Sequence, residues 1–306
     1  MGTTVRARVR CIMPRFARRA RRLVLLAGAA AALVLTGCTI QSLALRSVDS
    51  LFDRTVTALM REGDLQFAES AIPGDLKLLE AVSDSDPTNA RYNQLVCMGF
   101  ASYALAFAED DPSRAVVFYS RARDYGQRGM AALGIPRTVF AANAATMKAA
   151  LGKLSRSDLP IVFWTASAWG SAVSLQLNEP DALAAIPTIN AMMEWVQARE
   201  PGFFYGGPSL YFGVYYGSFP PALGGKPALA KENFDRAHEA SGGKFLMTDV
   251  LYARIYAVGT QDRQLFQDLL TRVVDAPSNL LPEQGLANSV AKKRAGELLA
   301  RVEELF

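Results

Sequence analysis

The sequence is poor in the side chains that carry most enzyme chemistry. It has one histidine, His238, and three cysteines, Cys11, Cys38 and Cys97. A lone histidine has no partners with which to build a histidine-rich metal site, and we expect His238 to lie on a solvated helix face. The Gly-x-Ser-x-Gly, phosphate-loop and dinucleotide-binding motifs do not occur. We therefore expect no catalytic residues, no metal and no cofactor.

The sequence also has few stretches that alternate apolar and polar residues, and no Asn-Gly or Asp-Gly turn joins two β-branched runs. Instead, Pro and Gly separate segments of ordinary helix length. These breaks lie at Pro73-Gly74, Pro87, Pro112, Pro136, Pro160, Pro180, Pro201, Pro208, Pro220-Pro221 and Pro277. The absence of strand patterns and the regular punctuation predict an all-α fold.

Acidic residues are missing from the N-terminal part, where the first is Asp49 and eight arginines lie within the first 22 residues. The apolar run that follows, Leu23–Leu35, is shorter than the ~20 residues that a bilayer-spanning helix needs. It leads into Leu35-Thr36-Gly37-Cys38, which resembles the lipobox of bacterial lipoproteins. A basic head, a short apolar middle and a small-residue cleavage site predict an export signal that is removed before Cys38.

The lipobox resemblance implies acylation of Cys38, for example with palmitate, and anchoring of the chain to a membrane by its N-terminal lipid. Residues 1–37 are then the signal peptide, 38–47 a lipidated tether and 48–306 a single helical domain. Thr39 follows the cysteine in place of the aspartate that is linked to inner-membrane retention. We expect the protein to face the periplasm, on the outer rather than the inner membrane.

The net charge of +4 belongs to this signal. Removing its eight arginines from the 33 basic residues leaves 25, against 29 acidic ones. This balance, without a basic face, excludes nucleic acid as a partner. Cys97 remains as an unpaired cysteine in an apolar run, where we expect it to pack as a small hydrophobic side chain. We expect Glu109, Asp110 and Asp111 to form a solvated loop cap.

One helical pattern occurs twice, a small residue followed by an aromatic four positions later and an alanine three positions after that. The two copies are Ala115-Tyr119-Ala122 and Ala230-Phe234-Ala237, and Gly99 and Gly213 precede them by 16 and 17 residues. This pattern is typical of the second helix of a tetratricopeptide repeat, where small residues let two helices approach and the aromatic fills the groove between hairpins.

Weaker pairs join Ile161–Leu177 with Leu183–Ala198 and Val250–Val258 with Gln264–Val274, and a first pair is expected within Val48–Val82. We predict about five tetratricopeptide-like helix pairs in a curved array with a central cavity or pore. An irregular α-bundle is the alternative.

The segment Phe203–Pro221 stands out because eight of its nineteen residues are aromatic, with glycines between them. It predicts either an apolar ligand cavity or partner-binding surface, or a tightly packed helix with an aromatic core. On a helix, Tyr211 and Tyr215 share one face, and Phe212 and Tyr216 share the next. The candidate binding residues are Trp164, Trp169, Phe203, Phe204, Tyr205, Tyr211, Phe212, Tyr215 and Tyr216.

Several motifs, in order, resemble the T-component of tripartite ATP-independent periplasmic (TRAP) transporters. They are Tyr92, Ser102–Phe107, Tyr119-Ser-Arg-Ala122, Gly126 and Gly129, then Gly206-Gly207-Pro208, Phe212–Gly217, Gly224-Gly225, Ala230-Phe234-Ala237, Val250–Val258, Leu286-Ala287-Asn288, Lys293-Arg294-Ala295, Leu298-Leu299 and Phe306. The resemblance implies a tetratricopeptide-like lipoprotein that docks the periplasmic solute-binding P-component. It also implies homotrimers and a cavity or pore, with a hydrophobic ligand. An assembly scaffold of the cell envelope, with a polar concave face and no closed cavity, is the alternative function.

Overall fold

The computed structural model describes residues 50–219 and 225–306, which contain helices and no β-strand. Within these ranges, the predicted all-α fold is confirmed. The signal peptide, Cys38 and the tether up to residue 47 lie outside the described residues, as do Pro220, Pro221 and Gly224. Residues 50–61 are helical. The chain divides into the units Met1–Thr57 and Ala58–Phe306, and the helices named from here on belong to the second unit.

The helices follow one another with short connections. They are α2 (Leu65–Ser85), α3 (Ala90–Phe107), α4 (Pro112–Ala132), α5 (Ala144–Leu151), α6 (Leu159–Ser174), α7 (Pro180–Ala184), α8 (Ile186–Arg199), α9 (Phe203–Ser218), α10 (Pro227–Ala240), α11 (Met247–Leu251), α12 (Arg263–Asp275), α13 (Gly285–Ala300) and α14 (Val302–Leu305). A π-helical segment, η4 (Tyr252–Ala257), continues α11. Short 3-10 turns lie at Arg137–Val139, Arg156–Asp158 and Pro282–Gln284.

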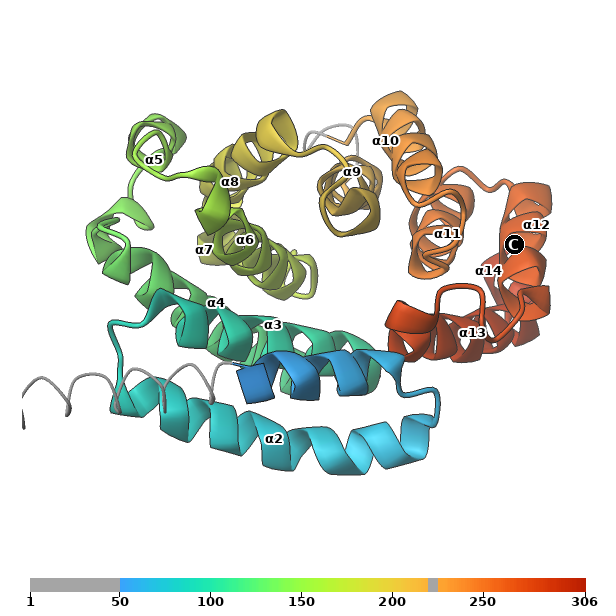
Figure 1. Ribbon diagram of the computed structural model, residues 1–306. Helices are drawn as coiled ribbons and strands as arrows, with labels where there is room; N and C mark the ends of the chain where they lie inside the picture. The colour runs from blue at the N-terminus through green and yellow to red at the C-terminus, as the bar shows by residue number, and fades with distance from the viewer. Residues whose placement is uncertain (1–49, 220–224) are drawn as a thin grey trace, which may run out of the picture. The chain divides into compact units, whose positions relative to one another are not determined.

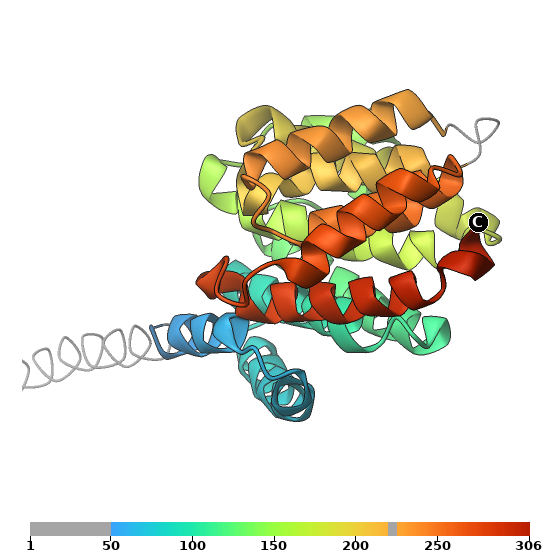
Figure 2. The same cartoon turned by 90° about the vertical axis from the view of Figure 1, so that its right-hand side faces the viewer.

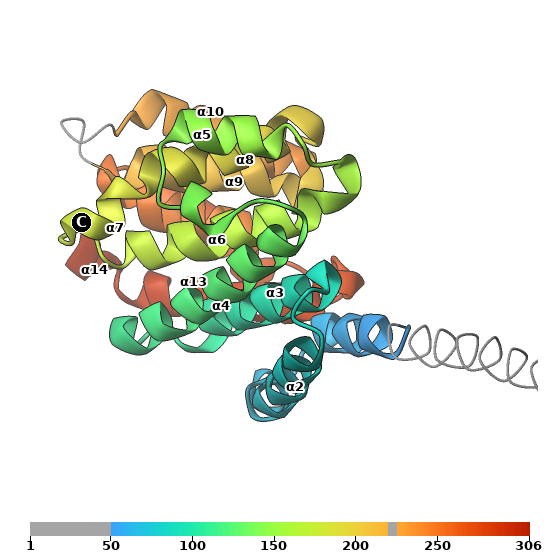
Figure 3. The same cartoon turned by 90° about the vertical axis from the view of Figure 1, so that its left-hand side faces the viewer.

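Consecutive helices pack as hairpins, which confirms the predicted repeat architecture. Helices α3 and α4, α6 and α8, α9 and α10, and η4 and α12 are in contact. These are four of the predicted pairs. The fifth, expected within Val48–Val82, stays a prediction, because this range is divided between the two units. Helix α5, which the sequence pattern did not predict, packs on α8, and Figure 3 shows both from the side on which α5 lies in front.

The array of hairpins in the unit Ala58–Phe306 closes on itself. Figure 1 shows α3, α6, α9, α11 and α13 around a common centre. Helix α13 packs against α11 and α12, and it also contacts α2. Figure 2 shows α13 running beside the C-terminal helices at this closure. Two arginines of the C-terminal part, Arg254 and Arg294, form ion pairs with Glu109 of the N-terminal part. The predicted curved array is therefore a closed ring of helices.

Local sequence signals explain where most of these helices begin. The side chains of Asp64, Asn89, Asp111 and Asp262 accept hydrogen bonds from backbone N–H groups in the first turns of α2, α3, α4 and α12. Such caps satisfy donors that have no partner within the helix. Proline also marks the start of a helix: Pro112 is the first residue of α4 and Pro180 the first residue of α7. At this position the missing N–H of proline costs no hydrogen bond within the helix.

Two predicted breaks were wrong. Helix α2 continues from Leu65 to Ser85 across Pro73 and Gly74. The long face of α2 buries Ala68, Ile72, Leu76 and Leu79, and this packing outweighs the hydrogen bond that proline removes. Pro208 likewise lies inside α9 rather than at its end.

The residues of the repeat pattern lie between helices. Ala115, Ala122, Ala230, Phe234 and Ala237 are fully buried, and Tyr119 is 2% exposed. A Cβ on Gly213 would meet the ring of Phe234 at 3.0 Å, so α9 and α10 approach closely there. Gly99 differs from this expectation, because its neighbour is Leu76 of α2 rather than a residue of α4.

Candidate functional site

The centre of the helical ring holds two adjoining cavities, of about 190 and 120 Å³. We call them together the lumen. Together they reach the lower end of the roughly 300–1,000 Å³ typical of ligand pockets. Seven residues line both cavities, which makes the lumen continuous: Leu105, Trp164, Ser167, Ser171, Phe204, Phe245 and Met247. These residues come from both halves of the chain, so the lumen exists because the ring is closed.

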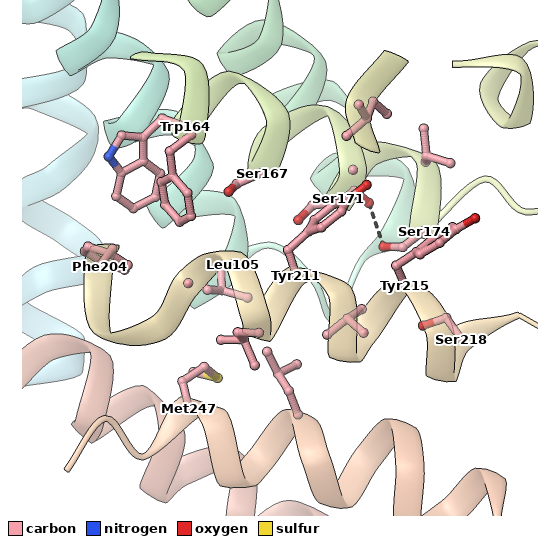
Figure 4. A pocket seen from close by; sticks show the side chains of 18 of the residues that line it. Leu105, Trp164, Ser167, Ser171, Ser174, Phe204, Tyr211, Tyr215, Ser218 and Met247 are labelled. Atoms are coloured by element: carbon pink, nitrogen blue, oxygen red, sulfur yellow. Dashed lines mark hydrogen bonds between the residues drawn. The ribbon is translucent and has the colours of Figure 1, made fainter. Parts of the chain in front are cut away.

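One end of the larger cavity, where it adjoins the smaller one, is aromatic. The ring centroids of Trp164 and Phe204 are 4.8 Å apart, and those of Phe204 and Phe245 are 5.6 Å apart, both edge to face. Phe163 packs on Trp164 at 5.2 Å. Edge-to-face packing is a preferred geometry of aromatic pairs and fixes the rings in place. Figure 4 shows Trp164 and Phe204 at one end of the pocket, and Ser174, Tyr215 and Ser218 at the other.

Phe204 reaches the lumen from an unusual stretch of backbone. Phe204, Tyr205 and Gly206 have φ angles of 45°, 58° and 81°, so the first turn of α9 is left-handed. Each non-glycine residue in this region costs about 1–2 kcal/mol. Gly206 lies directly against the backbone of Ala237 in α10, where a Cβ would come within 2.9 Å of the Ala237 Cα. The backbone therefore stores strain at the point where it presents Phe204 to the cavity.

The structure divides the predicted aromatic residues into two groups. Trp164, Phe204, Tyr211 and Tyr215 line the lumen. The other five do not, because the rotation of each helix turns them elsewhere: Trp169 packs near Phe140, Phe203 on Phe163, Tyr205 on Phe245, Phe212 on Tyr216, and Tyr216 also faces Lys226. These five are therefore not lumen residues, and a role for them in partner binding stays a prediction.

Tyr211 is held in the wall by its hydroxyl group. That group donates a 2.7 Å hydrogen bond to Oδ1 of Asn190 in α8, and the ring stacks on Tyr215 at 6.4 Å. Burial, followed by the neighbouring Tyr215, raises the pKa of Tyr211 well above its usual value. Gly170 of α6 admits the Tyr211 ring, because a Cβ there would meet it at 2.7 Å. Tyr211 is thus a neutral and rigid part of the wall.

The other end of the larger cavity is polar and contains an ion cluster. The Glu109 carboxylate lies 2.9 Å from Nη1 of Arg294 and 3.3 Å from Nη1 of Arg254, and it accepts a 2.7 Å hydrogen bond from the Tyr119 hydroxyl. Glu109 and Arg254 line the larger cavity, and Tyr119 lines the smaller one. Ser171, Ser174 and Ser218 add hydroxyl groups to the same cavity as Glu109.

The ionisation of Glu109 follows from these contacts. Burial alone would raise the pKa of Glu109, but the guanidinium groups of Arg254 and Arg294 and the Tyr119 hydroxyl together lower it below its usual value. Burial, followed by Glu109, raises the pKa of Tyr119. Glu109 is therefore a carboxylate at neutral pH and Tyr119 a neutral donor.

The ion cluster overturns one expectation from the sequence. Asp111 does cap α4, but Glu109 is not part of a solvated loop, because its side chain is 12% exposed and points to Arg254 and Arg294. The partners lie 145 and 185 residues further along the chain. No local signal reveals a contact across such a separation; an acid directly after a long apolar helix was the one available hint.

His238 also differs from its expected place on a solvated face. Its Nδ1 lies 2.8 Å from Oδ1 of Asp249, whose side chain is 1% exposed, and Arg272 lies 3.4 Å from the other Asp249 oxygen. These groups link α10, α11 and α12 and line neither cavity of the lumen. No cluster of three or more potential metal ligands occurs in residues 50–219 and 225–306.

Cys97 is fully buried in α3. Burial raises the pKa of its thiol to about 12, partly offset by contacts with Thr165 and Gly126. The thiol is therefore protonated at neutral pH and weakly nucleophilic. In the part of the chain that the structure describes, no helix combines the length and the apolar character needed to cross a membrane.

A closed ring of helical hairpins around a largely apolar lumen defines the chain as an all-α repeat protein. The sequence model of the TRAP transporter T-component family matches residues 61–306. The chain belongs to this family, an accessory component of TRAP transport. It is also similar to an uncharacterized protein of Treponema pallidum (strain Nichols), with 24% identity over an alignment that covers 90% of this chain and 95% of the relative.

Proposed function

We propose that this protein is a non-enzymatic accessory of TRAP-type solute uptake that holds an apolar ligand in its lumen and docks the periplasmic solute-binding P-component. The observation that carries the proposal is the continuous lumen, whose larger cavity is walled by Trp164, Phe204, Tyr211 and other apolar side chains. Apolar concave sites with a few convergent polar groups are the usual form of ligand pockets. An assembly scaffold would need a polar concave face instead.

The lumen is tested with the neutral fluorescent probe N-phenyl-1-naphthylamine, whose emission rises in apolar surroundings. Ser167 lines both cavities, so Ser167→Phe fills the lumen where they join. Ser70 is exposed on α2, and Ser70→Phe is the matched control. We expect the native protein and the control to bind the probe and Ser167→Phe to lose most binding. Equal binding by all three proteins would show that the lumen is not the site.

Docking is tested by affinity capture with the purified, tagged protein from a periplasmic extract of its own organism. We expect recovery of a TRAP solute-binding protein. Ser70→Phe should recover the same partner. Ser70 lies outside the lumen, and the substitution changes the protein surface at this one exposed position. Repeated capture without any solute-binding protein would contradict docking and leave the lumen result standing on its own.

Membrane attachment is a separate part of the proposal, supported by Leu35-Thr36-Gly37-Cys38. Lipid on Cys38 would hold the helical unit at the periplasmic face of the envelope, with the outer membrane as the proposed address. Growth with labelled palmitate should label the native protein, whereas Cys38→Ala should carry no label and should appear in the soluble fraction. Label that persists in Cys38→Ala would refute lipidation at this residue.

A further inference from the structure

The charged end of the lumen is not electrically balanced. Two guanidinium groups, those of Arg254 and Arg294, face one carboxylate, that of Glu109. Among the described residues that line the two cavities, Glu109 is the one acidic side chain and Arg254 the one basic side chain. One positive charge is therefore left over at this end of the otherwise apolar larger cavity.

Arg294 and Arg254 differ in how many of their N–H donors have a hydrogen-bond partner. Arg294 donates through Nη1 to Glu109 and through Nη2 to the Leu105 carbonyl, and its side chain is 12% exposed. Arg254 reaches Glu109 through Nη1 at the longer distance of 3.3 Å, and its side chain is 39% exposed. Its Nε is buried and has no hydrogen-bond partner among the described residues. The unbalanced charge is therefore that of Arg254.

The edge of the Arg254 guanidinium group that does not contact Glu109 is suited to bind a carboxylate. Nε and Nη2 form the side of the guanidinium group opposite the Nη1 contact with Glu109, and two parallel N–H donors match the two oxygens of a carboxylate. Arg254 lies within η4, the π-helical segment. Such segments occur often at functional sites, since the extra residue in the turn redirects a side chain.

The aromatic and charged ends lie apart along α9. The regular part of α9, from Gly207 to Ser218, rises roughly 17 Å. Phe204 precedes it, and a Cβ on Gly217 would lie 2.7 Å from Ile255, so η4 runs beside the far end of α9. A ligand that fills this space would meet rings at one end and a guanidinium group at the other.

We propose that the lumen binds an amphipathic monocarboxylate, with its hydrocarbon chain against Trp164 and Phe204 and its carboxylate on the Nε edge of Arg254. This inference rests on the proposed lumen function and names the ligand class. One carboxylate balances the single remaining charge and satisfies the Arg254 Nε–H. The hydroxyl group of Ser218 lies in the same cavity as Arg254. It can donate to a carboxylate oxygen.

The test measures displacement of N-phenyl-1-naphthylamine by dodecanoate and by dodecanol, which have the same chain and differ in the head group. We expect the native protein to prefer dodecanoate by roughly tenfold to hundredfold, the range of a hydrogen bond to a charged group. Arg254→Met, which keeps the apolar stem, should lose this preference, measured as the ratio of the displacement constants of dodecanoate and dodecanol in the same variant. Arg254→Lys, which keeps the charge without the fork, should retain part of it.

The matched control is Arg263→Met, because Arg263 also forms one ion pair with a glutamate and is 44% exposed but lies outside the lumen. It should keep the full preference. If the native protein does not bind the neutral probe at all, the proposed lumen function fails. If the probe binds but dodecanoate and dodecanol compete equally, only the carboxylate inference fails. Tighter competition by dodecyl phosphate than by dodecanoate would also overturn it in favour of a phosphate head group.

Discussion

Replacing Gly206 with alanine should be among the most damaging single-methyl changes in the chain. Two independent costs combine at this position. Its φ of 81° is left-handed, which costs an L-residue about 1–2 kcal/mol. The new Cβ would also come within 2.9 Å of both the Ala237 Cα and the Ala240 Cβ, and such overpacking costs about 1–3 kcal/mol. The expected loss in the free energy of unfolding is therefore about 2–5 kcal/mol.

The control for this prediction is Gly134→Ala. Gly134 has a φ of 88°, but a Cβ there would meet nothing within 4 Å, so this variant carries the backbone cost alone. Urea denaturation of both variants separates the two contributions, and Gly206→Ala should be the less stable by about the overpacking cost. It should also bind the lumen probe more weakly, because Gly206 adjoins Phe204. Equal destabilisation by the two substitutions would refute the close seating of α9 on α10.

The other predictions concern packing, charge and the buried thiol. Ala230→Leu should lower stability by about 1–3 kcal/mol because Ala230 is fully buried, whereas Ala228→Leu, at an exposed position, should be nearly neutral in thermal melting. Glu109→Gln leaves two guanidinium groups without their carboxylate and should cost about 3–5 kcal/mol at pH 7. Because the folded-state pKa of Glu109 lies below its usual value of 4.5, its contribution to stability is complete above that pH and is lost as the pH falls through the folded pKa. Urea titrations from pH 7 to pH 3 should thus show a smaller pH-dependent loss in Glu109→Gln than in the native protein, and parallel curves would contradict this. Maleimide labelling with peptide mapping at pH 7 should find Cys97 unmodified in the folded protein and modified in urea, since burial raises the pKa of this thiol to about 12; rapid labelling of folded protein would show that Cys97 is accessible.

The sequence predicted most of the residue types at the site, but it did not predict which side chains point into the cavity. The spacing of Tyr211, Phe212, Tyr215 and Tyr216 showed that two of them would face away from any cavity. Which two depends on how α9 is rotated. The rotation is set where glycines touch neighbouring helices, as Gly213 does with Phe234. These contacts belong to the assembled ring and have no local signature.

The ring itself shows the same division. Helix caps such as Asp64 and Asn89, and the pairing of Ala115 with Ala122 and of Ala230 with Ala237 one helical turn from an aromatic, act over a few residues or between successive helices. Short-range hydrogen bonds and small-residue contacts can therefore be predicted from the sequence, and they determined the helices and the hairpins. The left-handed start of α9 could not be predicted from the sequence, because Phe204 and Tyr205 adopt backbone angles that residues with a side chain rarely adopt.

The amino-acid sequence by itself determined the helical class, the hairpin repeats and the family. The helices and hairpins depend on residues that are close along the chain, and the family depends on the order of motifs within the chain. Lipidation of Cys38 stays a prediction. The tertiary structure decided that the array closes, that Trp164, Phe204, Tyr211 and Tyr215 face inward, and that Glu109 meets Arg254 and Arg294. The physical reason is the separation of these residues along the sequence. Glu109 lies 145 and 185 residues from its two arginine partners, so the ion cluster forms only when all the intervening hairpins have packed against one another.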